Sequence, residues 1–265
     1  MSTIAFETGL PGGQGGAWRC SGFTLIELIV VIAIIALLIS LLLPALTLAR
    51  QTGQNAGCLS NQRQIAIAMQ VYLNDHRDTY MAYRSSSSNI AWFWELKGSD
   101  VNWPYSTADY LSTAEAFFCP AHVLVQHPSW PMLTDESDKE YAIRRGYLSY
   151  GMTMGLTVDF RQPGWPEVST RGADVLDPAK TILLADAFQP LFQHGIFYLM
   201  PYYIQDGAFE YGVPAPRHPS TAANVLWTDG HAGTVRSPDS SDLGSLYWQE
   251  GLTNYLMTPT YWDRY

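Results

Sequence analysis

The chain has 265 residues, of which 47% are hydrophobic and only 15% are charged. This length is enough for one sizeable hydrophobic core, and the low charge content excludes a highly solvated, disordered chain. The net charge of −9 argues against binding to a nucleic-acid backbone, because such binding needs clustered Lys and Arg. A nucleic-acid partner is therefore not expected.

An apolar run dominates the N-terminal part of the chain. Residues 25–43 are almost all Leu, Ile, Val or Ala, and only Glu27 and Ser40 interrupt them. A helix of this length rises about 30 Å, which matches the hydrocarbon thickness of a bilayer. We therefore predict a transmembrane helix at roughly 25–43. Because a carboxylate inside a membrane costs a few kcal/mol, Glu27 needs a cationic partner.

The nearest candidate cation is an amino terminus created by cutting the chain between Gly22 and Phe23. Gly22 suits a narrow protease site, because glycine has no side chain. The motif Gly-Phe-Thr-Leu-Ile-Glu at 22–27 and its apolar tail resemble the processing site of type IV pilins and type II secretion pseudopilins. The resemblance implies that a prepilin peptidase cleaves after Gly22 and N-methylates Phe23. It also implies that Glu27 guides assembly by meeting the amino group of Phe23 in a neighbouring subunit.

Residues 1–22 are accordingly interpreted as a cleaved leader peptide. This leader is Gly-rich, and it is less basic than pilin-type leaders commonly are. Two alternatives are an ordinary membrane anchor with an accidental Glu and a secretory signal peptide. A signal peptidase would remove the apolar run, but no small-residue cleavage site follows Leu43. The sequence therefore favours a retained helix.

The helix is predicted to continue well beyond the apolar run. Pro44 should kink or loosen it, and resemblance to pilins, which commonly carry a proline at this distance, implies a role for Pro44 in assembly. Between Cys58 and Leu73, apolar residues recur at spacings of three, four and seven, as in an amphipathic helix. Gly53 and Gly57 weaken the helical pattern locally. We predict one N-terminal helix over 23–75.

Cysteine usage indicates an oxidising destination. Cys20 lies in the leader, so a processed chain keeps only Cys58 and Cys119. A disulfide between them would close a loop of about 60 residues and stabilise the fold by about 4 kcal/mol. Two alternatives are a pair of free thiols and a zinc pair formed by Cys119 and His122, although no second pair has suitable spacing.

Residues 76–265 are predicted to form a globular head rich in strands. Strand signals occur at 147–152, 181–185 and 195–200, and a hairpin is expected at 224–235 around Asp229 and Gly230. A long helix followed by strands indicates an α+β fold in which an antiparallel sheet packs on the amphipathic half of the helix. The resemblance to pilins implies the same fold.

The head carries a looser resemblance to prepilin-type proteins of planctomycete and verrucomicrobial relatives, which are marked by a His, a spacer and an Asp-Gly pair. Here the marker is His218 with Asp229-Gly230, and the spacer is one residue longer than is typical of that group. His218, Asp229 and His231 could bind a divalent metal such as zinc. The alternative is a plain hairpin turn with a hydrogen-bonded histidine.

The expected function is structural, and no enzymatic activity is expected, because no motif supplies a nucleophile or an activated water. The protein should be a filament subunit of a type IV pilus-like or type II secretion system, with its head outside the cytoplasm. Its partners would be prepilin peptidase, other copies or pseudopilins, and an inner-membrane assembly platform. The alternative is a minor, tip-located pseudopilin or a membrane-anchored protein that binds a secreted substrate or a polysaccharide, since nine Trp and sixteen Tyr could stack on sugars.

Overall fold

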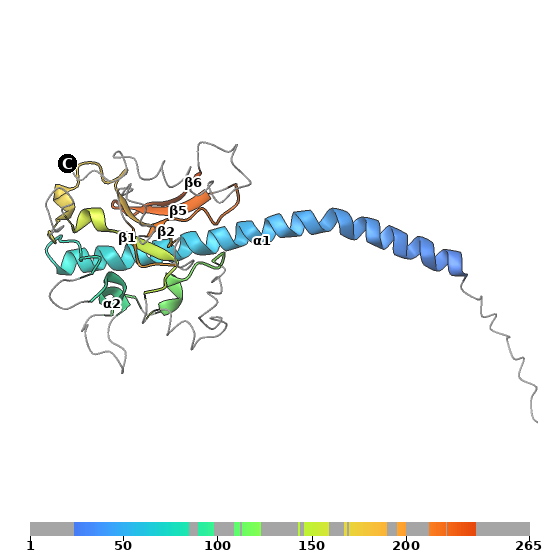
Figure 1. The fold of residues 1–265 in the computed structure, drawn as a ribbon, viewed down its shortest axis with the longest axis horizontal. Coiled ribbons are helices and arrows are strands. Elements are labelled where there is room, and N and C mark those ends of the chain that lie inside the picture. Colours follow the sequence, from blue (N-terminus) through green and yellow to red (C-terminus); the bar gives the residue numbers. More distant parts are fainter. Residues whose placement is uncertain are drawn as a thin grey trace, which may run out of the picture. The chain divides into compact units, whose positions relative to one another are not determined.

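The structure is a computed structural model and describes residues 24–84, 90–97, 109–111, 113–122, 143, 146–158, 167–168, 170–189, 195–199, 212–220 and 222–236. Two compact units follow each other along the chain, Met1–Leu46 and Thr47–Tyr265. The boundary falls inside helix α1, Leu25–Asp75, which is one helix of 51 residues (Figure 1). The prediction of a single long N-terminal helix is confirmed.

The second half of α1 forms one wall of the head's hydrophobic core. The buried positions recur at helical spacing on one face: Cys58, Gln62, Ile65, Ala66, Ala68, Met69 and Leu73. Gly57 has a packing role here, because a Cβ at this position would lie 3.3 Å from Cγ of Pro120. Because Gly57 has no side chain, the loop after Cys119 can lie close to the helix at this point. α1 continues through Gly57 without a break.

Aromatic side chains fill the core between α1 and the rest of the head. α2 (Trp92–Lys97) and the 3-10 helix η1 (Ala114–Phe117) bring Trp92, Phe93 and Phe117 together, with ring centroids 5.6–6.2 Å apart. All three side chains are almost fully buried. These three aromatic residues therefore build the core and offer no surface on which a sugar could stack. Trp103, another tryptophan of this part of the chain, lies outside the described residues.

The sheet of the head has the strand order β3–β1–β2–β5–β6, and β4 also pairs with β2. Figure 1 labels β1, β2, β5 and β6 in this sheet. Its strands are β1 Tyr150–Thr153, β2 Ile182–Phe188, β3 Tyr198–Leu199, β4 Val213–Pro214, β5 Ala222–Trp227 and β6 Ala232–Arg236. Two further 3-10 turns, η2 Met154–Leu156 and η3 Gly172–Asp174, lie between β1 and β2 along the chain.

The sheet is mixed: the predicted antiparallel pairing holds for four strand pairs, and one further pair is parallel. The pairs β1–β2, β2–β4, β2–β5 and β5–β6 are antiparallel, but β1–β3 is parallel. β2 runs opposite to β1, and β3 runs in the same direction as β1. Because β3 lies on the edge of β1 that faces away from β2, two strands of the same direction become neighbours.

The hairpin of β5 and β6 lies where the sequence predicts it. Gly230 has φ of +90°, a conformation that glycine adopts without steric cost. The amide of Gly230 donates to the carbonyl of Trp227, and the amide of Trp227 donates to the carbonyl of His231. The Asp-Gly pair therefore closes a four-residue connection between the two strands.

Amide side chains fasten α1 to the hairpin. Gln62 Nε2 donates to the carbonyl of Asn224 at 3.1 Å, and Asn55 Nδ2 donates to Oγ1 of Thr234 at 3.2 Å. Asn224 Nδ2 donates to Oδ1 of Asn55 at 2.8 Å. Because these bonds join residues more than 160 positions apart, they fix the position of β5 and β6 on the helix.

Tyr80 buries its ring under the same sheet and makes the fold sensitive to alkali. Burial raises the pKa of Tyr80 from 10.0 to about 12, although the side chain of Thr228 acts in the opposite direction. The folded protein thus keeps a proton that the unfolded chain loses as the pH rises from 10.0 to about 12. The free energy of unfolding should therefore fall through this range, by up to ~1.4 kcal/mol per pH unit for one tyrosine.

Urea unfolding of wild type and Tyr80→Phe across this range tests the effect. The variant should lose stability with pH less steeply than wild type above pH 10.0, the ordinary pKa of tyrosine. Below that pH the two curves should run parallel, because the phenol is protonated in both states. Equal slopes above it would contradict the prediction.

Candidate functional site

The described chain begins beside the predicted processing site. Gly22 and Phe23 lie outside the described residues, and Thr24 precedes the first turn of α1. The hydroxyl and the backbone amide of Thr24 both donate to Oε2 of Glu27, at 2.7 and 2.8 Å. The amide of Glu27 donates back to Oγ1 of Thr24 at 3.2 Å. This reciprocal pair is a capping box, which satisfies donors left free at a helix start.

The apolar part of α1, residues 25–43, has a largely exposed surface. Its large side chains are exposed, from 46% at Val31 to 75% at Leu25. The sole other hydroxyl in this run, that of Ser40, donates to the carbonyl of Leu37 at 2.7 Å. α1 is the one described helix long and apolar enough to cross a membrane. So much exposed apolar surface requires lipid or other helices around it.

Pro44 lies inside α1, and the helix continues on both sides of it. Proline lacks a backbone N–H, so one hydrogen bond of the helix is missing at this turn. The predicted role of Pro44 in assembly stays a prediction.

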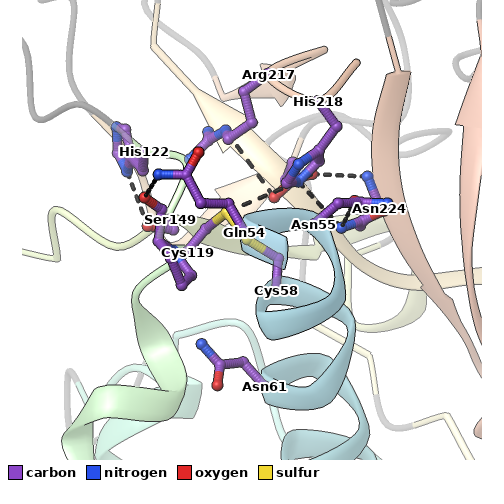
Figure 2. Close-up of a disulfide and its surroundings, with 12 residues drawn as sticks. Gln54, Asn55, Cys58, Asn61, Cys119, His122, Ser149, Arg217, His218 and Asn224 are labelled. Atoms are coloured by element: carbon purple, nitrogen blue, oxygen red, sulfur yellow. Dashed lines mark hydrogen bonds and ion pairs between the residues drawn. A yellow bond between two sulfur atoms is a disulfide. The ribbon is translucent and has the colours of Figure 1, made fainter. Parts of the chain in front are cut away.

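The two cysteines of the head form a disulfide between α1 and the loop after η1 (Figure 2). The Cα atoms of Cys58 and Cys119 are 4.9 Å apart, which is within the usual range for a disulfide. Two side chains of α1 hold the same loop: Asn61 donates to the carbonyl of Phe118, and Gln54 donates to the carbonyl of Pro120. The loop is therefore attached to α1 covalently and by hydrogen bonds.

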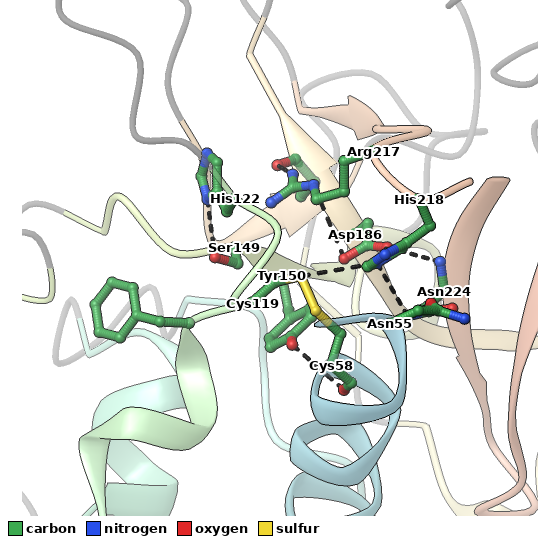
Figure 3. Close-up of polar contacts among 12 residues, drawn as sticks. Asn55, Cys58, Cys119, His122, Ser149, Tyr150, Asp186, Arg217, His218 and Asn224 are labelled. Atoms are coloured by element: carbon green, nitrogen blue, oxygen red, sulfur yellow. Dashed lines mark hydrogen bonds and ion pairs between the residues drawn. A yellow bond between two sulfur atoms is a disulfide. The ribbon is translucent and has the colours of Figure 1, made fainter. Parts of the chain in front are cut away.

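A buried group of charged side chains lies against this disulfide (Figure 3). The Asp186 side chain, on β2, accepts a hydrogen bond at its Oδ2 from the backbone N–H of Asn224 at 2.6 Å. His218 Nε2 lies 3.1 Å from Oδ2 of Asp186, and Arg217 Nε lies 3.9 Å from its Oδ1. The Asp186 and His218 side chains are fully buried, and that of Arg217 is 10% exposed. A charged pair is tolerated at such burial only because each partner compensates the other.

Two pKa directions follow from this burial. Burial lowers the pKa of the Arg217 guanidinium, while the charge of Asp186 acts in the opposite direction. Burial raises the pKa of the Tyr150 phenol, and the nearby Asp186 carboxylate raises it further. The Tyr150 hydroxyl donates to the carbonyl of Cys58, which connects β1 to the turn of α1 that carries the disulfide.

Removing the charge of Asp186 should destabilise the head strongly. Asp186→Asn keeps the shape of the side chain but leaves Arg217 buried without a counter-charge, which should cost about 3 kcal/mol. Asp177→Asn is the matched control, because Asp177 pairs with Lys180 at 2.7 Å on the surface. An exposed pair of this kind contributes little to stability, so the control should unfold nearly as wild type does. Urea unfolding of both variants measures the difference, and equal losses would contradict it.

The predicted metal residues do not come together as one site. Asp229 and His231 pair at the hairpin, with Oδ1 and Nδ1 2.6 Å apart, and the His231 ring stacks on Trp227. His218 lies before the first residue of β5, whereas Asp229 and His231 follow its last residue. A strand of this length rises about 20 Å, so His218 is at the opposite end of β5.

Asp186, Arg217 and Asn224 were not singled out as site residues by the sequence analysis. Asp186 did carry a signal, since it is the one charged residue in a strand that is otherwise apolar. Such a residue in a buried strand usually has a buried partner. The identity of that partner depends on strand pairing, which the sequence pattern does not specify.

A comparison with known families identifies the N-terminal segment. Residues 19–43 match the model of the prokaryotic N-terminal methylation motif. With the long apolar helix and the α+β, pilin-like architecture, this match supports a subunit of the type IV pilin or pseudopilin class that is anchored in a membrane. No curated protein and no solved structure matches the chain significantly. The planctomycete and verrucomicrobial grouping, and the His–Asp-Gly marker, stay predictions.

Proposed function

We propose that this protein is a structural subunit of a type IV pilus-like or type II secretion pseudopilus filament. Prepilin peptidase cuts after Gly22 and methylates Phe23, and α1 is retained. The protein is held in the cytoplasmic membrane by a single span, with its head in the periplasm, until an inner-membrane assembly platform adds it to a filament. Filament growth then packs the apolar helices of neighbouring copies or of other pseudopilins together.

The observation that carries the proposal is the coincidence of the methylation motif with an apolar helix segment whose large side chains are exposed in the described structure. Residues 19–43 match the motif, and the large side chains of 25–43 are about half exposed or more. In a membrane, acyl chains cover this surface, and in a filament, neighbouring helices can replace them at little cost. Glu27 is the one charged residue in 24–46, so it is the natural partner for a methylated amino terminus.

The test combines intact-mass analysis of the mature protein with imaging of sheared surface material. We expect a chain that begins at methylated Phe23 and filaments that contain it. A mature chain that begins beyond Pro44 would identify a secreted protein without the apolar part of α1 and would contradict the proposal.

A second role is a minor, tip-located subunit or a membrane-anchored protein that binds a secreted substrate or a surface polysaccharide. Abundance separates the two roles. A major subunit should dominate sheared filaments, whereas a minor subunit should be scarce in them.

A further inference from the structure

The disulfide and the buried charged group share one set of possible metal ligands. In the described part of the chain, one group of three such side chains has its ligand atoms within 4.8 Å of one another: Cys58, Cys119 and His218. His218 Nε2 lies 3.7 Å from Sγ of Cys119, and the same nitrogen lies 3.1 Å from Oδ2 of Asp186. Four side chains from four parts of the chain therefore converge in the core (Figures 2 and 3).

Two of these separations match edges of a tetrahedral zinc site. Zinc–sulfur bonds of about 2.3 Å and zinc–nitrogen bonds of about 2.0 Å place a sulfur and a nitrogen ligand about 3.6 Å apart. Nitrogen and carboxylate oxygen ligands lie about 3.4 Å apart in the same geometry. The observed 3.7 and 3.1 Å are close to both values. The Cys58 and Cys119 sulfurs are bonded to each other, so the four ligands become available only after the disulfide is reduced.

The environment of the cluster also suits a bound cation. Oδ1 of Asp186 is buried and has no hydrogen-bond partner within the described residues. A buried carboxylate oxygen without such a partner is rare and calls for an explanation such as an ion. Two thiolates, one carboxylate and a zinc ion sum to a single negative charge, which the neighbouring Arg217 would neutralise.

We propose that the dithiol form of the head binds one zinc ion through Cys58, Cys119 and His218, with Asp186 as the fourth ligand. A phosphine reductant gives two electrons to the disulfide and takes the oxygen of water, and each sulfur becomes a thiol. Zinc then displaces the two thiol protons and forms two metal–sulfur bonds. Because each sulfur either bonds zinc or its partner sulfur, the metal and the disulfide exclude each other.

The experiment uses the full chain in detergent, in a Cys20→Ser background so that two cysteines remain. The protein is unfolded in the presence of a phosphine reductant and is then refolded with zinc. Unbound metal is removed before the zinc content is measured. We expect about one zinc per reduced chain and almost none per oxidised chain. Cobalt in place of zinc should give the thiolate charge-transfer band and the visible bands of a tetrahedral site. Absence of these cobalt bands in the reduced chain would overturn the proposal.

Histidine variants test the ligand set. His218→Ala should weaken zinc binding by at least about 100-fold. His122→Ala is the matched control, because His122 follows Cys119 closely but its Nδ1 bonds to Oγ of Ser149. It should bind zinc as wild type does. If the loss follows His122 and not His218, the proposed site is wrong, and if His218→Ala does not fold, the cobalt spectrum of the reduced parent chain decides.

Discussion

Glu27→Leu should leave the protein in the membrane and cleaved before Phe23, but it should abolish filament assembly. Leu is favoured over an acidic side chain in hydrocarbon, so insertion does not suffer. The variant loses half of the Thr24–Glu27 capping box at the helix start. It also loses the carboxylate that would neutralise the amino terminus of a neighbouring subunit. In a polymer, that loss raises the concentration needed for growth by ~100-fold.

The measurement is the yield of sheared filaments together with membrane fractionation and the N-terminal mass. Ser40→Leu is the matched control, since Ser40 is the other polar residue of the run and already bonds to a carbonyl of its own helix. The control should assemble normally. Normal filaments from Glu27→Leu would rule out the pairing mechanism.

The long helix could be predicted from the sequence because its signals are local. The apolar run and the spacing of buried positions after Cys58 both follow the helical repeat, and they require no knowledge of the rest of the fold. Gly57 weakened the pattern, yet its conformational cost is small beside the burial that α1 gains in the core. Tertiary packing therefore decided the continuity of α1.

Most strands could be predicted from local residue patterns. The expected ranges 147–152, 181–185, 195–200 and 224–235 fall on β1, β2, β3 and the β5–β6 hairpin. β4, Val213–Pro214, has two residues and therefore no periodicity. The parallel pairing of β1 with β3 depends on which edge the chain reaches after β2, which local residue preferences do not encode.

The buried charged group illustrates the same limit. Arg217 reaches Asp186 because the loop before β5 returns beside β2, and the antiparallel pairing of the two strands sets this approach. The sequence instead grouped His218 with Asp229 and His231, which are near in the chain but lie beyond the other end of β5. Distance along a strand separates residues that seem adjacent in sequence.

Removing the disulfide should cost about 4 kcal/mol of unfolding free energy. Cys58 and Cys119 are 61 positions apart, so the bond constrains a long loop of the unfolded chain. In a variant with both cysteines replaced by Ser, the hydrogen bonds of Asn61 and Gln54 and the packing of Pro120 at Gly57 still hold the loop on α1. Each such bond contributes about 1 kcal/mol net and cannot replace the covalent constraint. The variant should therefore fold with much lower stability.

Urea unfolding of the full chain in detergent, with and without reductant and always with a chelator, measures this cost. The chelator keeps metal from occupying reduced Cys58 and Cys119, so the disulfide alone is tested. Reductant should lower the unfolding midpoint of the wild type once reduction is verified by thiol titration, and it should leave the double Cys→Ser variant unchanged. If verified reduction leaves the wild-type midpoint in place, the hydrogen bonds and core packing around α1 already hold the loop, and the entropic account of this disulfide fails.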